Sequence, residues 1–404
     1  MPSNRLSALR RRPRRPAPGA RRRSPALAAA AIAGVLALTA TACDSGGGDG
    51  GSAPSGSADQ REISLPDLND KLKELGVDLD KWKNGGWRNW DRDQWLREAE
   101  DFINPIIEGL WKPDRMKEAR DPDEPVPGDV ADDQGVTDPE PRPVTAARVD
   151  RPYSAHVPVA GKVFFDGPKG SMVCSATVVT DPAHPGTSNM VWTAGHCVHA
   201  GSGGGWYKNV AFVPNYNDAG LTGQALDDAT REQLAPKGVW WADWAQTSQQ
   251  WIDTGASVGG KGAPYDFAVL HVKPEGSGGK SLEETVGGAL PVNFQAPAVP
   301  SIRSMTATGY PAAPPFDGQQ LYQCSDKPGR LSLDASQPTM YRVGCTMTAG
   351  SSGGGWVTTG SDGKPALVSN TSIGPANATW LAGPHLGTEA KSLYDAVSRK
   401  FAGR

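Results

Sequence analysis

Short runs rich in β-forming residues follow one another from Val144 onward, separated by clusters of Gly, Pro and Asp. Many short strands between turn residues favour a β-barrel or β-sandwich. Gly (49) and Pro (35) exceed a fifth of the 404 residues, which suits a turn-rich, all-β domain. The runs are Gly161–Phe165, Cys174–Thr180, Met190–Thr193, Asn209–Val213, Phe267–Val272, Met305–Gly309, Gly355–Thr359 and Ala366–Asn370. A final amphipathic run, Glu389–Phe401, predicts a closing helix.

The first residues are typical of an export signal. Arginines crowd the stretch from Arg5 to Arg23, and an Ala-rich apolar stretch follows up to Ala42. We therefore expect a signal peptide over 1–42. Leu-Thr-Ala-Thr-Ala-Cys at 38–43 resembles the lipobox of bacterial lipoproteins, which implies an acylated Cys43 and a membrane anchor. The alternative is an ordinary cleaved signal with an incidental cysteine, and the export route, Sec or Tat, stays open.

Three segments separate this signal from the β-rich part. Residues 43–61 are rich in Gly and Ser and predict a flexible tether. Residues 62–117 contain two helical periodicities, among them Trp95 to Leu110 with a kink at Pro105, and five tryptophans. This segment is interpreted as a helical hairpin that packs on itself or on the next domain, as a pro-segment, or as a docking surface. Residues 118–147 predict an acidic, Pro-rich linker, and 148–404 form the main domain.

Charge and cysteines narrow the class of protein. The net charge is -3 and no basic patch follows residue 23, so a nucleic-acid partner is not expected. Nothing indicates a cofactor. If Cys43 is acylated, four cysteines remain, and export makes two disulfides expected. Four cysteines allow three pairings, of which sequence proximity favours Cys174–Cys197 and Cys324–Cys345.

Three segments carry the residue types of nucleophilic catalysis. They are Trp-Thr-Ala-Gly-His-Cys-Val at 192–198, Pro-Tyr-Asp-Phe-Ala-Val-Leu at 264–270 and Gly-Ser-Ser-Gly-Gly-Gly-Trp at 350–356. A serine hydroxyl needs a base to remove its proton and N–H groups to stabilise the oxyanion. A histidine oriented by a buried carboxylate is such a base, and glycines allow a close backbone approach.

These motifs resemble those of trypsin-like (chymotrypsin-fold) serine proteases, particularly the bacterial secreted type. Cys-Ser-Ala-Thr at 174–177 resembles the family strand whose cysteine bridges to the one after the histidine. The resemblance implies two six-stranded antiparallel β-barrels with the site between them. It makes His196 the general base, Asp266 its orienting carboxylate, Ser352 the nucleophile, and the N–H groups of Gly350 and Ser352 the oxyanion hole. It also makes Ser369 the start of the strand that pairs with the substrate.

Two departures from the family bear on activation and specificity. Ser351 stands where the family often has an Asp that pairs with a newly cut N-terminus. Thr346 stands where trypsin has the acidic residue of its specificity pocket, so cleavage after Arg or Lys is not supported. Thr346 and Ser369 are candidates for binding an acidic side chain, although no His in 366–374 matches the glutamyl-specific pattern. The preferred residue at the cut site stays open.

Other candidates have plainer interpretations. His196 and His199 suggest a metal site only weakly, because Cys197 has a better partner in Cys174, and no metal is expected. His271 is interpreted as a surface or packing residue. Four tryptophans lie between His196 and Asp266, in what we interpret as a long insertion. They are expected to pack locally, or else to form a substrate platform: Trp240, Trp241, Trp244 and Trp251.

The sequence therefore predicts an extracytoplasmic serine endopeptidase, surface-anchored or secreted, that acts on proteins or peptides through an acyl-enzyme. The alternative is a catalytically silent binding protein of the same fold, against which the three triad residues argue. A serine esterase of the α/β-hydrolase type would place its Ser before the acid and the His, whereas the order here is His, Asp, Ser. A further alternative gives the main role to the helical segment. The oligomeric state is not indicated.

Overall fold

The computed structural model describes residues 104, 106–121, 136–167, 170–256, 260–276, 279–360 and 363–403. All of them belong to one compact unit, Asp80–Arg404. The predicted signal peptide, Cys43, the tether, and most of the predicted helical segment and linker lie outside these residues. Among the described residues, no helix is both long and apolar enough to cross a membrane.

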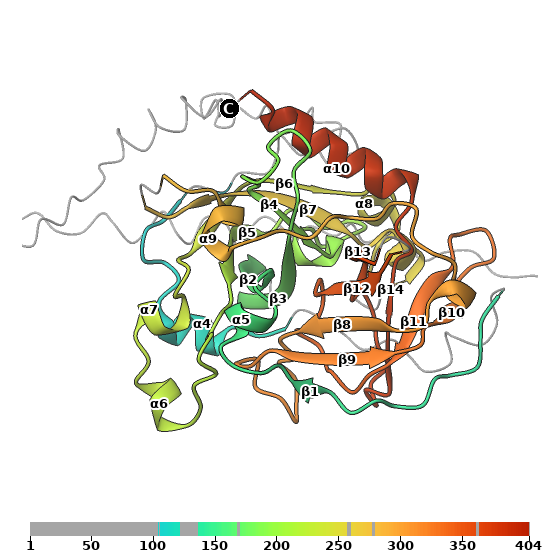
Figure 1. The fold of residues 1–404 in the computed structure, drawn as a ribbon, viewed down its shortest axis with the longest axis horizontal. Helices are drawn as coiled ribbons and strands as arrows, with labels where there is room; N and C mark the ends of the chain where they lie inside the picture. Colours follow the sequence, from blue (N-terminus) through green and yellow to red (C-terminus); the bar gives the residue numbers. More distant parts are fainter. Residues whose placement is uncertain are drawn as a thin grey trace, which may run out of the picture. The chain divides into compact units, whose positions relative to one another are not determined.

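The first half of the domain is a closed six-stranded barrel (Figure 1). Each strand pairs antiparallel with its neighbours, so the barrel leaves no free sheet edge. In the order around the barrel, the strands are β2 (Ala160–Gly167), β3 (Gly170–Val179), β4 (Met190–Thr193), β7 (Ala268–Pro274), β6 (Trp240–Thr247) and β5 (Lys208–Pro214).

Alternation along these strands builds two cores. In β7, Ala268, Leu270 and Val272 belong to the cluster of apolar residues inside the barrel. Val269, between them, belongs to a second cluster that includes residues of the other half of the domain, such as Trp356. Successive side chains of a strand point to opposite faces, so one strand contributes to both clusters. The two halves are therefore held together by a continuous apolar core.

The second half consists of two antiparallel sheets, whose strands are orange and red in Figure 1 except for the green β1. The five-stranded sheet has the order β1 (Ala147–Arg148), β9 (Tyr322–Asp326), β8 (Met305–Gly309), β12 (Gly355–Thr359) and β13 (Pro365–Asn370). The three-stranded sheet has the order β10 (Gly329–Leu331), β11 (Met340–Gly344) and β14 (Trp380–Gly383). The predicted all-β fold is confirmed, with the second barrel divided into these two sheets.

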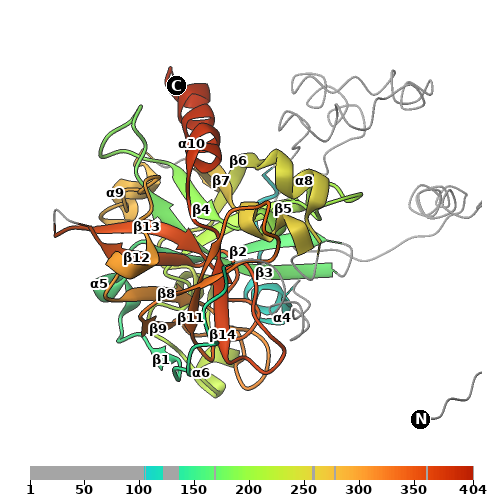
Figure 2. The ribbon, with the colours of Figure 1, turned by 90° about the vertical axis from the view of Figure 1, so that its right-hand side faces the viewer.

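Helices are few. The predicted closing helix is confirmed as α10 (Thr388–Phe401), which packs on the outside of the first barrel (Figure 2). Its Phe401 ring stacks on His271 of β7 with 3.6 Å between ring centroids. The other helical elements are one to two turns long: α4 (Pro113–Glu118), α5 (Tyr153–His156), η4 (Gly195–Cys197), α6 (Gln224–Asp227), α7 (Arg231–Leu234), α8 (Gln249–Thr254), η5 (Gly260–Tyr265), α9 (Leu282–Val286) and η6 (Val299–Ser301).

Residues 104–121 pack against the first barrel. Trp111 is fully buried, and its Nε1 donates to the Asn209 carbonyl at 2.9 Å. Asn104 bonds to both the N–H and the carbonyl of Val210, at 2.8 Å each. Arg115 forms an ion pair with Asp166 at 2.6 Å. We call residues 104–121 the strap. Of the three interpretations of 62–117, packing on the main domain describes this end.

The helical periodicity did not predict the strap's conformation. The run was expected to stay helical up to Leu110, but Ile106 to Leu110 form a turn. Gly109 has φ 69°, a left-handed conformation that interrupts an α-helix. Lys112 is extended before Pro113, as residues before proline usually are, and only then does α4 begin. The apolar residues of this run therefore pack without a helix.

Candidate active site

His196 lies in η4, directly after β4 ends at Thr193. The neighbouring Cys197 forms a disulfide with Cys174 of β3, as predicted, and so ties this turn to the barrel wall. A side chain at Gly195 would lie 2.6 Å from Thr247 Oγ1 and 3.0 Å from Asp266 Oδ1. The glycine before the histidine therefore lets the backbone approach the buried carboxylate.

Asp266 is 1% exposed and comes just before β7. Its Oδ1 accepts the His196 N–H at 2.9 Å, and its Oδ2 lies 2.6 Å from His196 Nδ1. The Ser372 hydroxyl donates to the same Oδ2 at 2.5 Å. A carboxylate only accepts, so Nδ1 carries the proton and Nε2 is left as the basic nitrogen of the ring.

Ser352 lies in the glycine-rich turn between β11 and β12. A side chain at Gly353 would lie 2.1 Å from Thr193 Oγ1, and one at Gly354 would lie 2.0 Å from the Thr308 carbonyl. Such distances exclude any Cβ, so both glycines are required by packing. The Ser352 carbonyl accepts from Ser175 N at 2.7 Å. The turn thus belongs to the second half of the domain but is docked on β3 of the first.

The peptide groups before Ser352 are held by the 310–313 segment and by Ser175. The Ala349 carbonyl accepts from Ala312 N at 2.6 Å. Because a trans peptide points its N–H and C=O in opposite directions, the Gly350 N–H faces away from Ala312. The Gly350 carbonyl accepts from the Ser175 hydroxyl at 2.9 Å, and Gly350 has φ 94°. Ser351, where the family often has Asp, donates to the Thr348 carbonyl at 2.8 Å.

One cavity brings the three predicted catalytic residues together. His196, Asp266 and Ser352 all line it, and its volume is about 130 Å³. Trp251 lines it as well, with its ring centroid 6.0 Å from that of His196, and its Nε1 donates to the His199 carbonyl at 2.9 Å. Of the four tryptophans expected to pack locally, Trp240 and Trp241 are buried in the barrel clusters, whereas Trp251 also borders the catalytic residues.

Thr346 and Ser369 are not among the residues that line this cavity. Thr346 Oγ1 accepts from Ala146 N at 2.8 Å, and Ser369 Oγ donates to the Pro384 carbonyl at 2.7 Å. The cavity is instead lined by 347–349 and by 371–376. Sequence reasoning also missed Ser372, which bonds Asp266, and Asn370, whose Nδ2 donates to the Asp266 carbonyl at 3.0 Å. The sequence feature that could have predicted Ser372 is a hydroxyl residue shortly after the predicted strand 366–370.

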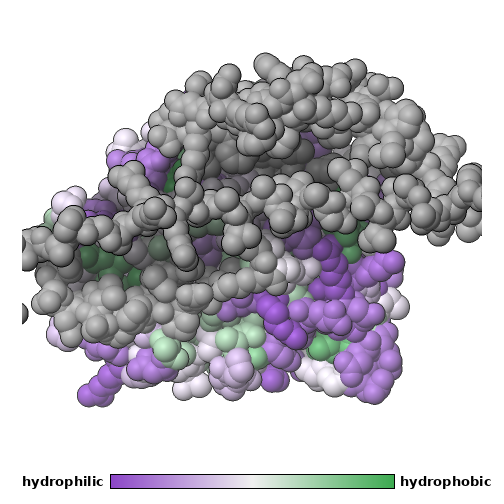
Figure 3. Space-filling model, turned by 180° about the vertical axis from the view of Figure 1, so that it is seen from behind, coloured by the Kyte–Doolittle hydropathy of each residue, from purple (hydrophilic) through white to green (hydrophobic). Residues whose placement is uncertain are grey.

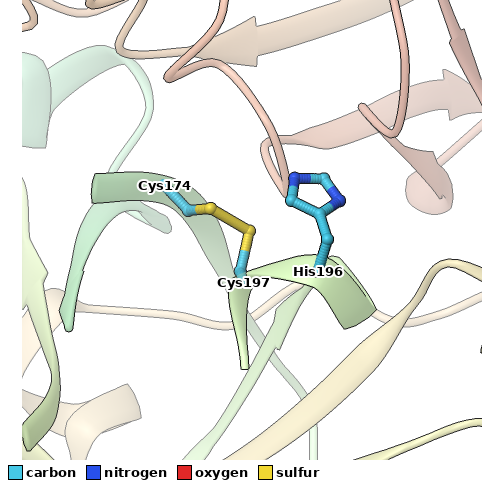
Figure 4. A group of neighbouring side chains, drawn as sticks. All are labelled: Cys174, His196 and Cys197. Atoms are coloured by element: carbon cyan, nitrogen blue, oxygen red, sulfur yellow. A yellow bond between two sulfur atoms is a disulfide. The ribbon is translucent and has the colours of Figure 1, made fainter. Parts of the chain in front are cut away.

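The described cysteines form disulfides, and two further histidines, His199 and His271, are buried in the domain. Among the described residues, one group has metal-ligating geometry: Cys174, His196 and Cys197. Figure 4 shows the disulfide between the two cysteines beside the His196 ring, so these sulfurs offer no thiolate to a metal. The second predicted disulfide, Cys324–Cys345, is present too. Burial lowers the pKa of His199 to about 4. His271 Nδ1 bonds Asp243 at 2.5 Å, which confirms the packing interpretation.

The chain is similar to several solved protease structures. It is 32% identical to a thermostable serine protease, AL20, from an extremophilic microorganism, with 61% of this chain and 99% of that chain covered and a TM-score of 0.48. It is 30% identical to the protease Anisep from Arthrobacter nicotinovorans, with 60% and 96% covered and a TM-score of 0.48. A Glu endopeptidase in complex with MPD is 18% identical, with 67% and 99% covered and a TM-score of 0.45.

No protein-family model and no curated protein matches the chain. The described residues form a closed six-stranded barrel joined through a common core to a second β-half. The chain thus has an all-β fold consistent with the chymotrypsin-like double barrel, and the solved structures to which it is similar are proteases, AL20 being a serine protease.

Proposed function

We propose that the chain is a serine endopeptidase of the trypsin-like family, which hydrolyses peptide bonds with Ser352 as nucleophile, His196 as general base and Asp266 as orienting carboxylate. The observation that carries this proposal is the pair of hydrogen bonds that the backbone N–H and Nδ1 of His196 donate to Asp266, in the cavity that Ser352 also lines. This arrangement supports a histidine that is fixed in position and basic at Nε2.

In the first half of the reaction, the Ser352 hydroxyl attacks the carbonyl carbon of the substrate and passes its proton to His196 Nε2. The tetrahedral intermediate carries a negative oxygen, which the N–H groups of Gly350 and Ser352 would stabilise. The anchoring of the Ala349 and Gly350 carbonyls supports this role, because it fixes the peptide groups before the reaction. The intermediate collapses when His196 returns the proton to the leaving amine, which leaves an acyl-enzyme on Ser352.

In the second half, water replaces the amine. His196 takes a proton from the water, which attacks the ester carbonyl, and the same oxyanion groups act again. The proton then passes to Ser352 as the acid product leaves. Asp266 stabilises the imidazolium that forms twice per cycle. Its burial and its bonds from His196 and Ser372 support that role.

The proposal extends to location. An export signal over 1–42, an acylated Cys43 and a tether up to residue 61 would hold the domain at the outer face of the membrane. Two disulfides among the described residues support an oxidising compartment. Cys43→Ala should move the protein from the membrane fraction to the soluble fraction with unchanged peptidase activity. Retention of the variant in the membrane fraction would contradict lipid anchoring at Cys43.

The test of the activity compares the wild-type protein with Ser352→Ala on a mixed library of unmodified peptides. Wild type should release internal cleavage products, which mass spectrometry would identify, and Ser352→Ala should release none above the uncatalysed background. Ser188→Ala is the matched control, since this serine is buried as well but bonds the Val179 carbonyl, away from the cavity. Equal cleavage by wild type and Ser352→Ala would contradict the proposal.

A further inference from the structure

The cavity at Ser352 has an apolar wall. Met347, Ile373, Trp380 and Leu381 line it and are each at most 7% exposed. Ile373 and Trp380 belong to a small cluster with Leu331 and other apolar residues, so the wall is supported from behind. Apolar surface of this kind gains free energy by contact with an apolar group and loses it by contact with a charge.

The described lining of the cavity offers no counterion to a charged side chain of the substrate. Of the described residues that line the cavity, the ionisable ones are His196 and Asp266. Asp266 is already bonded by His196 and by Ser372. Arg342 lies behind the wall, with its guanidinium carbon 5.4 Å from the centre of the Trp380 ring, and it donates to the Asp138 carbonyl. A lysine or glutamate that entered the cavity would lose hydration without gaining an ion pair.

Four hydroxyl groups of the lining already form hydrogen bonds within the protein. Thr348 donates to the Ala313 carbonyl at 2.7 Å, Ser351 to the Thr348 carbonyl at 2.8 Å, and Ser372 to Asp266 at 2.5 Å. The Thr371 hydroxyl accepts from Trp356 Nε1 at 2.8 Å. A carboxylate in the cavity would need hydroxyl protons that three of these four groups already use. This argues against the acidic side chain considered from the sequence.

The volume bounds the size of the occupant. About 130 Å³ is somewhat less than the cavity of about 150 Å³ that holds a benzene molecule in an engineered protein core. A single aliphatic side chain or one phenyl ring is the largest group that fits such a space. Indole is larger than benzene and is expected to fit poorly.

We propose that this cavity selects substrates with an uncharged apolar residue, of about the size of leucine or phenylalanine, at the carbonyl side of the cleaved bond. This inference rests on the proposed function, because that residue is the one that stays attached to Ser352 in the acyl-enzyme. Its side chain is therefore held next to the nucleophile, against Met347, Ile373, Trp380 and Leu381.

The first experiment measures kcat/KM for a series of peptides that differ only in that residue: Leu, Met, Phe, Trp, Lys, Arg, Asp and Glu. The kcat/KM of the Leu, Met or Phe peptide should exceed that of each charged peptide by at least about 100-fold. This ratio equals two tenfold steps of about 1.4 kcal/mol each, which is a modest cost for burying an unpaired charge. Trp should be cleaved more slowly than Phe. A preference for Lys, Arg, Asp or Glu would overturn the inference.

Two matched variants test whether the wall sets the preference. Met347 lines the cavity, whereas Met172 lies in the interior cluster of the first barrel, and both are buried methionines, at 0% and 3% exposure. Met347→Ala should enlarge the cavity and raise the Trp/Leu ratio of kcat/KM about tenfold. Met172→Ala should leave that ratio unchanged. An unchanged ratio in Met347→Ala would overturn the assignment of this wall, and the wild-type series remains decisive if a variant does not fold.

A fluorophosphonate carries no residue that would enter the cavity, so its reaction with Ser352 tests the proposed function independently of the proposed specificity. A wild-type protein that is labelled at Ser352 but cleaves after charged residues would overturn the inference alone. A protein that is neither labelled nor active on any peptide would overturn the proposed function, and the inference with it.

Discussion

Ser372 donates its hydroxyl to the Asp266 carboxylate, which in turn holds His196. We therefore expect Ser372→Ala to lower kcat by about tenfold, with a small change in KM, because one hydrogen bond of the orienting group is lost. Ser188→Ala is the control: this serine is equally buried but bonds the Val179 carbonyl, away from the site. Steady-state kinetics on one peptide would measure both variants, and equal loss in the two would contradict a positioning role for Ser372.

The sequence predicts the residues that line the cavity less well than it predicts the three motifs. The His, Asp and Ser of the three motifs line one cavity, and the motifs carry packing constraints of their own, such as Gly195 against Asp266. Thr346 and Ser369 were predicted as substrate-binding residues from their spacing to the family motifs, and neither lines the cavity. The chain leaves β13 after Asn370, so the hydroxyl near Asp266 comes from Ser372. Spacing along a sequence does not reveal where a strand ends.

Lys162 of β2 is buried, donates to the Gly318 carbonyl at 2.7 Å and lies over the ring of Tyr216. Burial lowers the pKa of this lysine to about 7 from an ordinary value near 10.5. Between these two values the unfolded chain binds the proton and the folded chain does not, so stability rises with pH through this window. Below pH 7 both states are protonated and the dependence from Lys162 ends.

Unfolding by urea at pH 7, 8.5 and 10 checks this. The free energy of unfolding of wild type should rise over that series relative to Lys162→Met, in which the titrating group is absent. Lys208→Met, at an exposed position of β5, should keep the wild-type dependence. Parallel curves for wild type and Lys162→Met would show that Lys162 has an ordinary pKa in the folded protein.

At the scale of elements, the strap is part of the barrel's packing. Trp111 is fully buried against Phe164, with 5.3 Å between ring centroids, and the Arg115 guanidinium lies 4.2 Å from the centre of a Trp111 ring. We expect Trp111→Ala to destabilise the domain by about 3–5 kcal/mol, as for other buried aromatics, without raising activity. Thermal unfolding and peptide hydrolysis would be measured together. Raised activity at unchanged stability would instead mark the strap as an inhibitory pro-segment.

A second segment, 136–148, runs along the other half of the domain. Asp138 pairs with Arg330 at 2.7 Å, Val144 accepts from Thr346 N at 2.9 Å, and β1 pairs with β9. The predicted linker thus includes, at its C-terminal end, residues that belong to the fold.

Some strands were not predicted from the sequence, and their structure explains why. The eight predicted runs correspond to β2, β3, β4, β5, β7, β8, β12 and β13. β6 was taken for an insertion, because a bulge between Ala242 and Trp244 breaks its alternation. Trp240, Ala242 and Ala245 face the barrel interior, so the inward positions shift by one residue at the bulge. β10 has only three residues, which is too few for a period to emerge.

At the scale of the whole molecule, two disulfides close loops of similar length, with separations of 23 and 21 residues. Removal of either pair by Cys→Ser substitution should cost about 3 kcal/mol of stability in the loop-entropy account. Only the loss of Cys174–Cys197 should also lower kcat, because that bridge adjoins His196. Denaturant unfolding and kinetics of the two double variants would test this. Equal kcat in both would contradict a link between that bridge and the site.

Hydrophilic residues prevail on the face in Figure 3 where described residues are visible. Among the described residues, the exposed large hydrophobic ones are Ile106, Ile107 and Val136, which border the undescribed stretches of the chain.

Activation of Ser352 by His196 and Asp266 should make this serine reactive toward a fluorophosphonate probe. The full chain, Ser352→Ala and His196→Ala would be incubated with the probe, and the labelled residue would be identified by peptide mass mapping. We expect one label, on Ser352, that is absent from Ser352→Ala and forms at least about 100-fold more slowly in His196→Ala. Absence of label from the correctly folded wild-type protein, or equal labelling of His196→Ala, would contradict this activation.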